Sequence, residues 1–106
     1  MFIENNSIKK TQLEEKVSRK VLGSGGSLMM VEVCFRKDGI GAVHFHIHEQ
    51  VSYIAQGSFE VTIGDEMKVL RQGDSFYAPG GVPHGVVALE DAKIIDVFTP
   101  MRTEFM

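Results

Sequence analysis

The fold of this chain is decided by one stretch, which reads Val43-His44-Phe45-His46-Ile47-His48-Glu49-Gln50. A fourth histidine, His84, follows much later, and these two places hold all the histidines of the sequence. In an extended strand, side chains two residues apart project from the same face. His44 and His46 should therefore point together, close enough for both imidazoles to bind one metal ion. Neutral imidazole suits zinc, copper, iron and nickel, so the pattern favours a metal site over a chance run of solvent-facing histidines.

The remaining sequence reads as short strands separated by turns. Apolar residues alternate in residues 28–36, and the histidines lie in a predicted strand over residues 40–48. Turns rich in glycine and proline recur along the chain, most strongly at residues 23–27 and 79–83. Only residues 11–16 suggest a weak helix or a loop. About eight to ten short strands at close spacing, with no strong helix signal, predict an all-β sandwich or barrel.

The composition is typical of one globular domain over residues 1–106. Apolar residues make up 43% and charged residues 24%, and this length supports a single modest core. A net charge of −3 without a basic run argues against nucleic acid as a partner. No apolar stretch is long enough to span a membrane, and the first residues lack a signal-peptide pattern, so we expect a cytoplasmic protein. Cys34 is the single cysteine and is expected to be a small core residue.

Two spaced motifs resemble those of the cupins, a family of small jelly-roll barrels. The first motif is carried by His44, His46, Gln50 and Gly57. The second is carried by Gly73, Pro79, Gly81 and His84. The chain departs from the family pattern at Gln50, where glutamate is usual, and at Ala88, where asparagine is common; its leading glycine, Gly39, is one position off. The motifs lie within residues 39–88, and the resemblance implies an all-β, single-domain cupin jelly-roll barrel.

The motif spacing also implies which side chains bind the metal. The expected ligands of one divalent ion are His44, His46, Gln50 and His84, and the ion is nickel, zinc, manganese, iron or copper. Taking His46 and His48 as the pair would lose the match to Gly57, so His48 is expected at the rim. Glu49 has the opposite strand parity to Gln50. Because three imidazoles and an amide leave the charge of the ion uncompensated, the site should attract an anionic ligand.

A closer resemblance is carried by residues 46–50, by Pro83-His84-Gly85 and by the run Asp96-Val97-Phe98-Thr99-Pro100-Met101-Arg102. These stretches are similar to the pectin-degradation cupins, which convert 4,5-unsaturated uronate monosaccharides to their open-chain keto form. That family also uses glutamine as a metal ligand. The resemblance implies working residues at Asp96, Phe98 and Arg102, a small anionic sugar as substrate, and a homodimer.

The residues of the last strand allow more than one role. Asp96 shares a face with Ile94 and Phe98, and a buried carboxylate must either be paired or have a raised pKa. Asp96 could therefore act as a general acid or base, or form a structural ion pair with Arg102 or another arginine. Arg102 could hold a sugar carboxylate through two hydrogen bonds, or lie exposed in the tail. Phe98 would either line the sugar ring or belong to the core.

Two other functions stay open at this point. One is a non-catalytic cupin that binds a small acidic ligand, as sensor domains do; such domains usually accompany a DNA-binding helical segment, for which this chain has no room. The other is a metal-dependent dioxygenase, because cupins host many chemistries and a fold does not fix a function.

Overall fold

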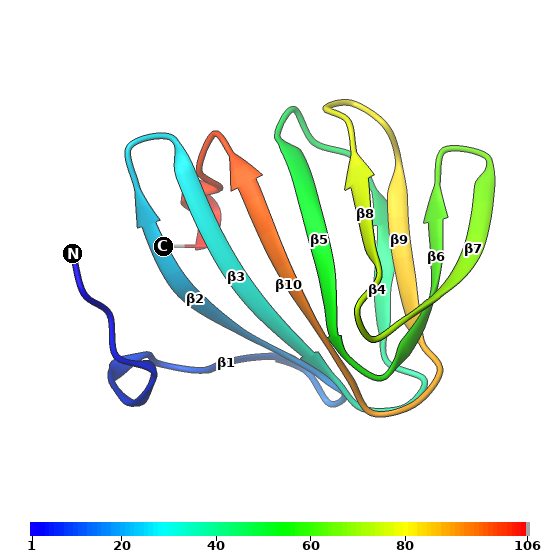
Figure 1. Cartoon of the computed structure of the whole chain (residues 1–106), viewed down its shortest axis with the longest axis horizontal. Helices are drawn as coiled ribbons and strands as arrows, with labels where there is room; N and C mark the ends of the chain where they lie inside the picture. The colour runs from blue at the N-terminus through cyan, green and yellow to red at the C-terminus, as the bar shows by residue number, and fades with distance from the viewer. Residues whose placement is uncertain (106) are drawn as a thin grey trace.

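The computed structural model describes residues 1–105, which form ten strands and two short 3-10 helices (Figure 1). In chain order these are η1 (Asn5–Ser7), β1 (Thr11–Glu14), β2 (Val17–Gly25), β3 (Leu28–Phe35), β4 (Ile40–His44), β5 (Glu49–Gln56), β6 (Ser58–Ile63), β7 (Glu66–Arg71), β8 (Ser75–Ala78), β9 (His84–Ala88), β10 (Ala92–Thr99) and η2 (Thr103–Phe105). No helix among these residues is long and apolar enough to cross a membrane.

The strands form two antiparallel sheets. The larger has the order β1-β2-β3-β10-β5-β8, and the smaller has the order β4-β9-β6-β7. Neighbouring strands are often far apart in sequence, as where β10 lies between β3 and β5. This all-β jelly-roll architecture confirms the fold predicted from the sequence.

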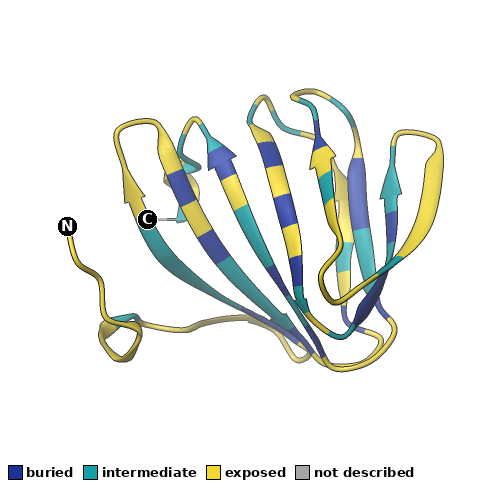
Figure 2. Ribbon diagram, viewed as in Figure 1, coloured by how far each residue is buried: buried dark blue, intermediate teal, exposed yellow. Residues whose placement is uncertain are grey.

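The core lies between the two sheets and is built from strands whose side chains alternate. Figure 2 shows this alternation on β3 and β5, where buried and exposed residues follow one another. On β3 the predicted apolar face turns inward, with Met29, Val31 and Phe35 buried. The ring of Phe35 meets that of Phe59, on β6, edge to face at 5.1 Å between ring centres. Such a pair contributes about 0.5–1.5 kcal/mol beyond burial and here joins the two sheets.

Two glycines permit close approaches that position the site. Gly57, between β5 and β6, has a φ of 75°, and a Cβ atom there would lie 2.6 Å from the carbonyl oxygen of Asp91. Gly85 lies in β9, where a Cβ atom would approach the backbone nitrogen of Val43 in β4 to 2.8 Å. A side chain at either position would force segments of the chain apart. At Gly85 it would separate the two strands that carry histidines.

The strand predicted over residues 40–48 is shorter than expected. β4 ends at His44, and residues 45–48 form a loop. In this loop the carbonyl oxygen of His46 accepts a hydrogen bond from the backbone N–H of Gly81 at 2.8 Å, rather than from a neighbouring strand. Gly81 belongs to the turn at residues 79–83, which is irregular, as predicted. The turn therefore holds the histidine loop in place of a sheet partner.

Two further expectations were wrong. Residues 11–16, predicted as a weak helix or a loop, contain the strand β1, which pairs with β2 at the edge of the larger sheet. All its side chains are exposed, so no apolar alternation reveals it in the sequence. Cys34 is half-buried beside Glu32, with 3.6 Å between Sγ and Oε1, on the face of β3 that points away from the core.

Candidate metal centre

Three histidines from two distant parts of the sequence converge in the structure. His44 is the last residue of β4, His46 lies in the following loop, and His84 is the first residue of β9. Antiparallel pairing of β4 with β9 sets His44 opposite His84. One ligand atom from each of the three lies within 4.8 Å of the others, a grouping that could hold a metal ion. The structure thus brings together the predicted pair and the distant third histidine.

A backbone carbonyl orients each of these imidazoles. Nδ1 of His44 lies 2.8 Å from the carbonyl oxygen of Ala42. Nδ1 of His46 lies 2.8 Å from that of His48, and Nδ1 of His84 lies 3.0 Å from that of Val82. A carbonyl oxygen can only accept, so each Nδ1 carries the proton and donates it. In the neutral rings, Nε2 is then left with a free lone pair. Such contacts to the second ring nitrogen commonly orient metal-binding histidines.

Gln50, near the start of β5, completes the cluster from the opposite sheet. Its side chain is buried, and its Oε1 lies 3.2 Å from Nε2 of His46 and 3.1 Å from Nε2 of His84. Burial lowers the pKa of both histidines, and the nearby Arg102 guanidinium lowers it further, so the neutral rings are favoured. An amide oxygen and two Nε2 lone pairs, all acceptors, therefore face one another without a proton between them. This donor set fits a divalent cation, which would satisfy all of them.

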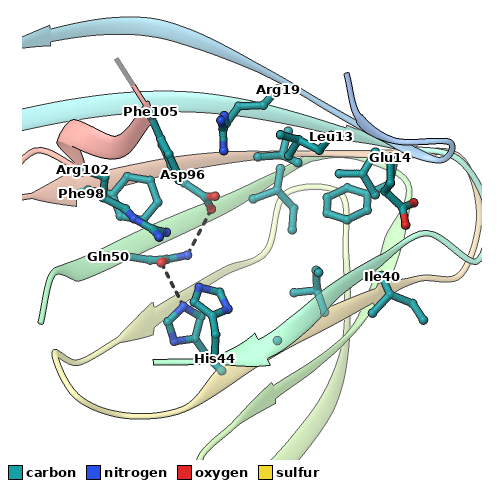
Figure 3. A pocket seen from close by; sticks show the side chains of 18 of the residues that line it. Leu13, Glu14, Arg19, Ile40, His44, Gln50, Asp96, Phe98, Arg102 and Phe105 are labelled. Carbon is teal, nitrogen blue, oxygen red and sulfur yellow. Dashed lines mark hydrogen bonds between the residues drawn. The ribbon is translucent and has the colours of Figure 1, made fainter. Parts of the chain in front are cut away.

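A hydrogen-bonded chain fixes the direction of the Gln50 amide. Its Nε2 donates to Oγ of Ser52 at 2.9 Å and to Oδ1 of Asp96 at 3.3 Å, the bond drawn in Figure 3. The Ser52 hydroxyl in turn donates to the same Asp96 oxygen at 2.6 Å. Because Asp96 accepts from the NH₂ group, the amide oxygen turns toward the histidines. Ser52 was missed in the sequence, although its place two residues after Gln50 on the same strand face was the available signal.

Asp96 lies in β10 and lines the same cavity as His44 and His84. This cavity has a volume of about 220 Å³. Burial raises the pKa of the Asp96 carboxyl to about 6, although the Ser52 hydroxyl and the Arg102 guanidinium pull it down. A carboxyl group with this pKa can both release and take up a proton near neutral pH.

Arg102 lies at the cavity wall rather than in an exposed tail. Its side chain is 16% exposed, and its Nε donates to Oε1 of Glu104 at 2.9 Å. Within residues 1–105 the ion pair of Arg102 is with Glu104 and not with Asp96, which was the structural alternative. The Arg102 guanidinium also lies over the ring of Phe105, 4.3 Å from its centre. Glu104 and Phe105 belong to η2 and were missed, because they follow the last predicted strand and belong to no motif.

Phe98 belongs to the core and also faces the cavity. It is buried and packs with Met29 and Val31, so it belongs to the core. Its ring also lines the cavity and meets the His46 ring edge to face, with 5.9 Å between ring centres.

His48 and Glu49 lie beside the cluster without joining it. The His48 ring is 5.3 Å from that of His46, and His48 is not among the three grouped histidines. Glu49 is exposed and accepts a hydrogen bond from the hydroxyl of Tyr77 at 3.1 Å. Glu49 and Gln50 point to opposite faces of β5, as their strand parity predicted.

Comparison with known proteins shows the family of this chain. The model of the cupin domain matches residues 31–98. The chain is 43% identical over 97 residues to the pectin degradation protein KdgF of Dickeya dadantii (strain 3937), covering 90% of this chain and 88% of that protein. The structure of KdgF from Halomonas sp. matches with a TM-score of 0.95 and 37% identity over 100% of this chain and 98% of that chain. An RmlC-like cupin from Shewanella frigidimarina also gives a TM-score of 0.95 with 37% identity, over 99% and 95% of the two chains. These matches confirm the resemblance to the pectin-degradation cupins, and the chain belongs to the cupin family.

Proposed function

We propose that this protein is a metal-dependent enzyme of pectin or alginate catabolism that converts 4,5-unsaturated uronate monosaccharides to their open-chain keto form. One observation carries the proposal beyond the similarity to KdgF. A carboxyl group with a pKa of about 6, that of Asp96, shares a small cavity with Gln50 and with His44 and His84 of the histidine cluster. The reaction needs such a proton carrier beside a site that polarises oxygen.

The size of the cavity supports a small substrate. Its volume of about 220 Å³ is below the range of roughly 300–1,000 Å³ that is usual for ligand pockets. A monosaccharide suits this space better than an oligosaccharide does. The exposed His44 leaves the cluster accessible from solvent, so a sugar could reach it.

We assign His44, His46, His84 and Gln50 as the ligands of one divalent ion, which is nickel, zinc, manganese, iron or copper. All four ligands are neutral, so the positive charge of the ion would favour an anionic substrate. When bound, the ion supplies a Lewis acid that polarises substrate oxygens.

The proposed reaction moves one proton within the sugar. Ring opening turns the anomeric carbon into an aldehyde and leaves an enol at the carbon that held the ring oxygen. Protonation of the neighbouring carbon then gives the ketone, so a proton passes from oxygen to carbon and no atom is gained or lost. In this scheme Asp96 takes up and returns the proton, Phe98 lines one side of the sugar, and Arg102 holds its carboxylate.

Arg102→Ala should raise KM about 10- to 100-fold and change kcat less. The loss removes hydrogen bonds between charged groups, which are worth about 1.5–3 kcal/mol each, from substrate binding rather than from the chemical step. Steady-state kinetics on unsaturated galacturonate measures both constants. Arg36→Ala, at an exposed arginine, is the control and should leave both unchanged. An unaltered KM in Arg102→Ala would contradict the role of this residue.

The function itself is tested on the purified full-length chain. Elemental analysis should find one divalent ion per chain, and the absorbance of the conjugated double bond of unsaturated galacturonate should fall as the sugar is consumed. Tight binding of the sugar without loss of absorbance would indicate a binding protein rather than an enzyme. Oxygen consumption with an acidic substrate would favour a dioxygenase.

We also propose a homodimer, formed through the outer face of the larger sheet. Sheet register aligns an apolar row of four partly exposed side chains there: Met30, Val97, Val51 and Tyr77. Glu49 borders the row at one side and Lys93 lies toward the other. Two copies related by a twofold axis would cover this apolar row against each other.

Val97→Glu should shift the protein from dimer to monomer, because it places a charge at the centre of the apolar row. Light scattering after size-exclusion chromatography measures the mass. Val69→Glu on β7 is a matched control, because Val69 and Val97 are both 38% exposed, and it should leave the mass unchanged. A parent protein of monomer mass would refute the proposed dimer.

A further inference from the structure

We propose that Arg19 is a second anion-binding residue of the cavity, which holds the carboxylate of the acidic sugar together with Arg102. The inference rests on the proposed function, since it concerns how the same site selects an acidic monosaccharide. It adds a determinant from β2, a strand outside the sequence motifs that mark the metal centre.

The position of Arg19 breaks the apolar pattern of its strand. It shares a face of β2 with Val17 and Val21, and sheet register sets it opposite Val33 of the core-facing row of β3. A charged side chain in a core-facing row is unfavourable unless it serves a function. Figure 3 shows that Arg19 points into the cavity, which it lines together with Asp96. Arg19 lies outside every motif of the sequence.

The surroundings of Arg19 leave its charge poorly compensated. Its guanidinium lies over the Phe105 ring, 3.9 Å from the ring centre, and Arg102 lies over the same ring at 4.3 Å. Burial lowers the pKa of Arg19, and the like charge of Arg102 lowers it further. Glu104 offers some attraction, but its carboxylate is already paired with Arg102. Among residues 1–105 no carboxylate forms an ion pair with Arg19.

An anion in the cavity, within reach of both guanidinium groups, would offset this arrangement. Each guanidinium can donate two parallel hydrogen bonds to a carboxylate. A uronate carries one carboxylate, and its oxygen-rich ring would then extend toward the histidines at the other side of the cavity. Arg19 would thus favour acidic over neutral sugars of the same shape.

A pair of ligands that differ in charge and by one methyl group tests this role. Saturated galacturonate and its neutral methyl ester are titrated into the full chain by calorimetry, which needs no turnover. The parent should bind the acid more tightly than the ester. Arg19→Gln should weaken binding of the acid about 10-fold and leave binding of the ester nearly unchanged. Arg19→Lys, which keeps the charge, should weaken binding of the acid less than Arg19→Gln does.

Lys20→Gln is the matched control, because it removes the same charge from the next residue of β2, whose ammonium group bonds to Asn5 at the exposed surface. It should change neither affinity. An Arg19→Gln variant that instead lost affinity equally for the acid and the ester, and unfolded at a lower temperature, would show that Arg19 has a structural role. That result would overturn the proposal. So would an unchanged affinity for the acid, or a parent without preference for it. Failure of the proposed function is separate, since it would appear as absent turnover of the unsaturated sugar while these affinities stayed measurable.

Discussion

His44→Ala is expected to remove the bound metal and nearly all turnover. Three imidazoles and one amide are the whole donor set that we assign, so the loss of one imidazole removes a quarter of it. Even changes in the groups that merely orient metal ligands cost about 10- to 100-fold in affinity, and loss of a ligand should cost at least that. Elemental analysis after dialysis, together with the absorbance assay, measures metal content and turnover on the same sample.

His48→Ala is the control for this experiment. The His48 ring lies beside a proposed ligand, with 5.3 Å between its centre and that of the His46 ring. The two variants also remove the same chemical group, an imidazole. His48→Ala should keep its metal and most of its turnover. Retention of metal by His44→Ala, or its loss from His48→Ala, would contradict the ligand assignment.

The strand pattern could be predicted where burial on one side of the chain is regular. Alternation of apolar residues identified the inner face of β3, and alternation along β5 placed Gln50 and Glu49 on opposite faces. Both predictions were possible because apolar and polar residues alternate in a strand that is buried on one face only. β1 leaves no such record, since it is held by backbone pairing to β2 and all its side chains are exposed.

The histidine pair shows a second limit of local reasoning. His44 and His46 do approach each other, with 5.3 Å between ring centres, but they do so across a strand end and a loop rather than along one strand. The turn that binds the His46 carbonyl comes from residues 79–83. The same turn leads into His84. A single remote segment thus both supplies the third histidine and shapes the loop of the second.

The rest of the site depends on contacts between segments that are distant in sequence. Ser52 matters because β10 pairs with β5 and brings Asp96 beside it. Arg19 and Phe105 come from opposite ends of the chain and meet only because η2 folds back over the cavity. No sequence pattern within either segment predicts this contact, so these residues could be identified only in the folded protein.

Asp96→Asn is expected to lower kcat by about 10²- to 10⁴-fold, the range typical of general acid–base steps, while metal content stays unchanged. Asparagine keeps an oxygen that can accept from the Ser52 hydroxyl and from the Gln50 amide, so the direction of Gln50 should be preserved. What it removes is the group that takes up and returns a proton. Turnover of unsaturated galacturonate and elemental analysis on the same preparation measure the two effects.

Two further variants separate proton transfer from positioning. Asp96→Ala removes the hydrogen bond from Gln50 to Asp96 and the one that holds the Ser52 hydroxyl, so it should lower metal content as well as kcat, whereas Asp96→Asn should lower kcat alone. Glu32→Gln makes the same chemical change on the neighbouring strand β3, at a carboxylate that faces away from the cavity beside Lys93, and should leave both unchanged. If Asp96→Asn turned the sugar over at the parent rate, Asp96 would not carry the proton. If it instead lost metal to the same extent as Asp96→Ala, the carboxylate would act by orienting Gln50, and the proton carrier would have to be sought among the other side chains that line the cavity.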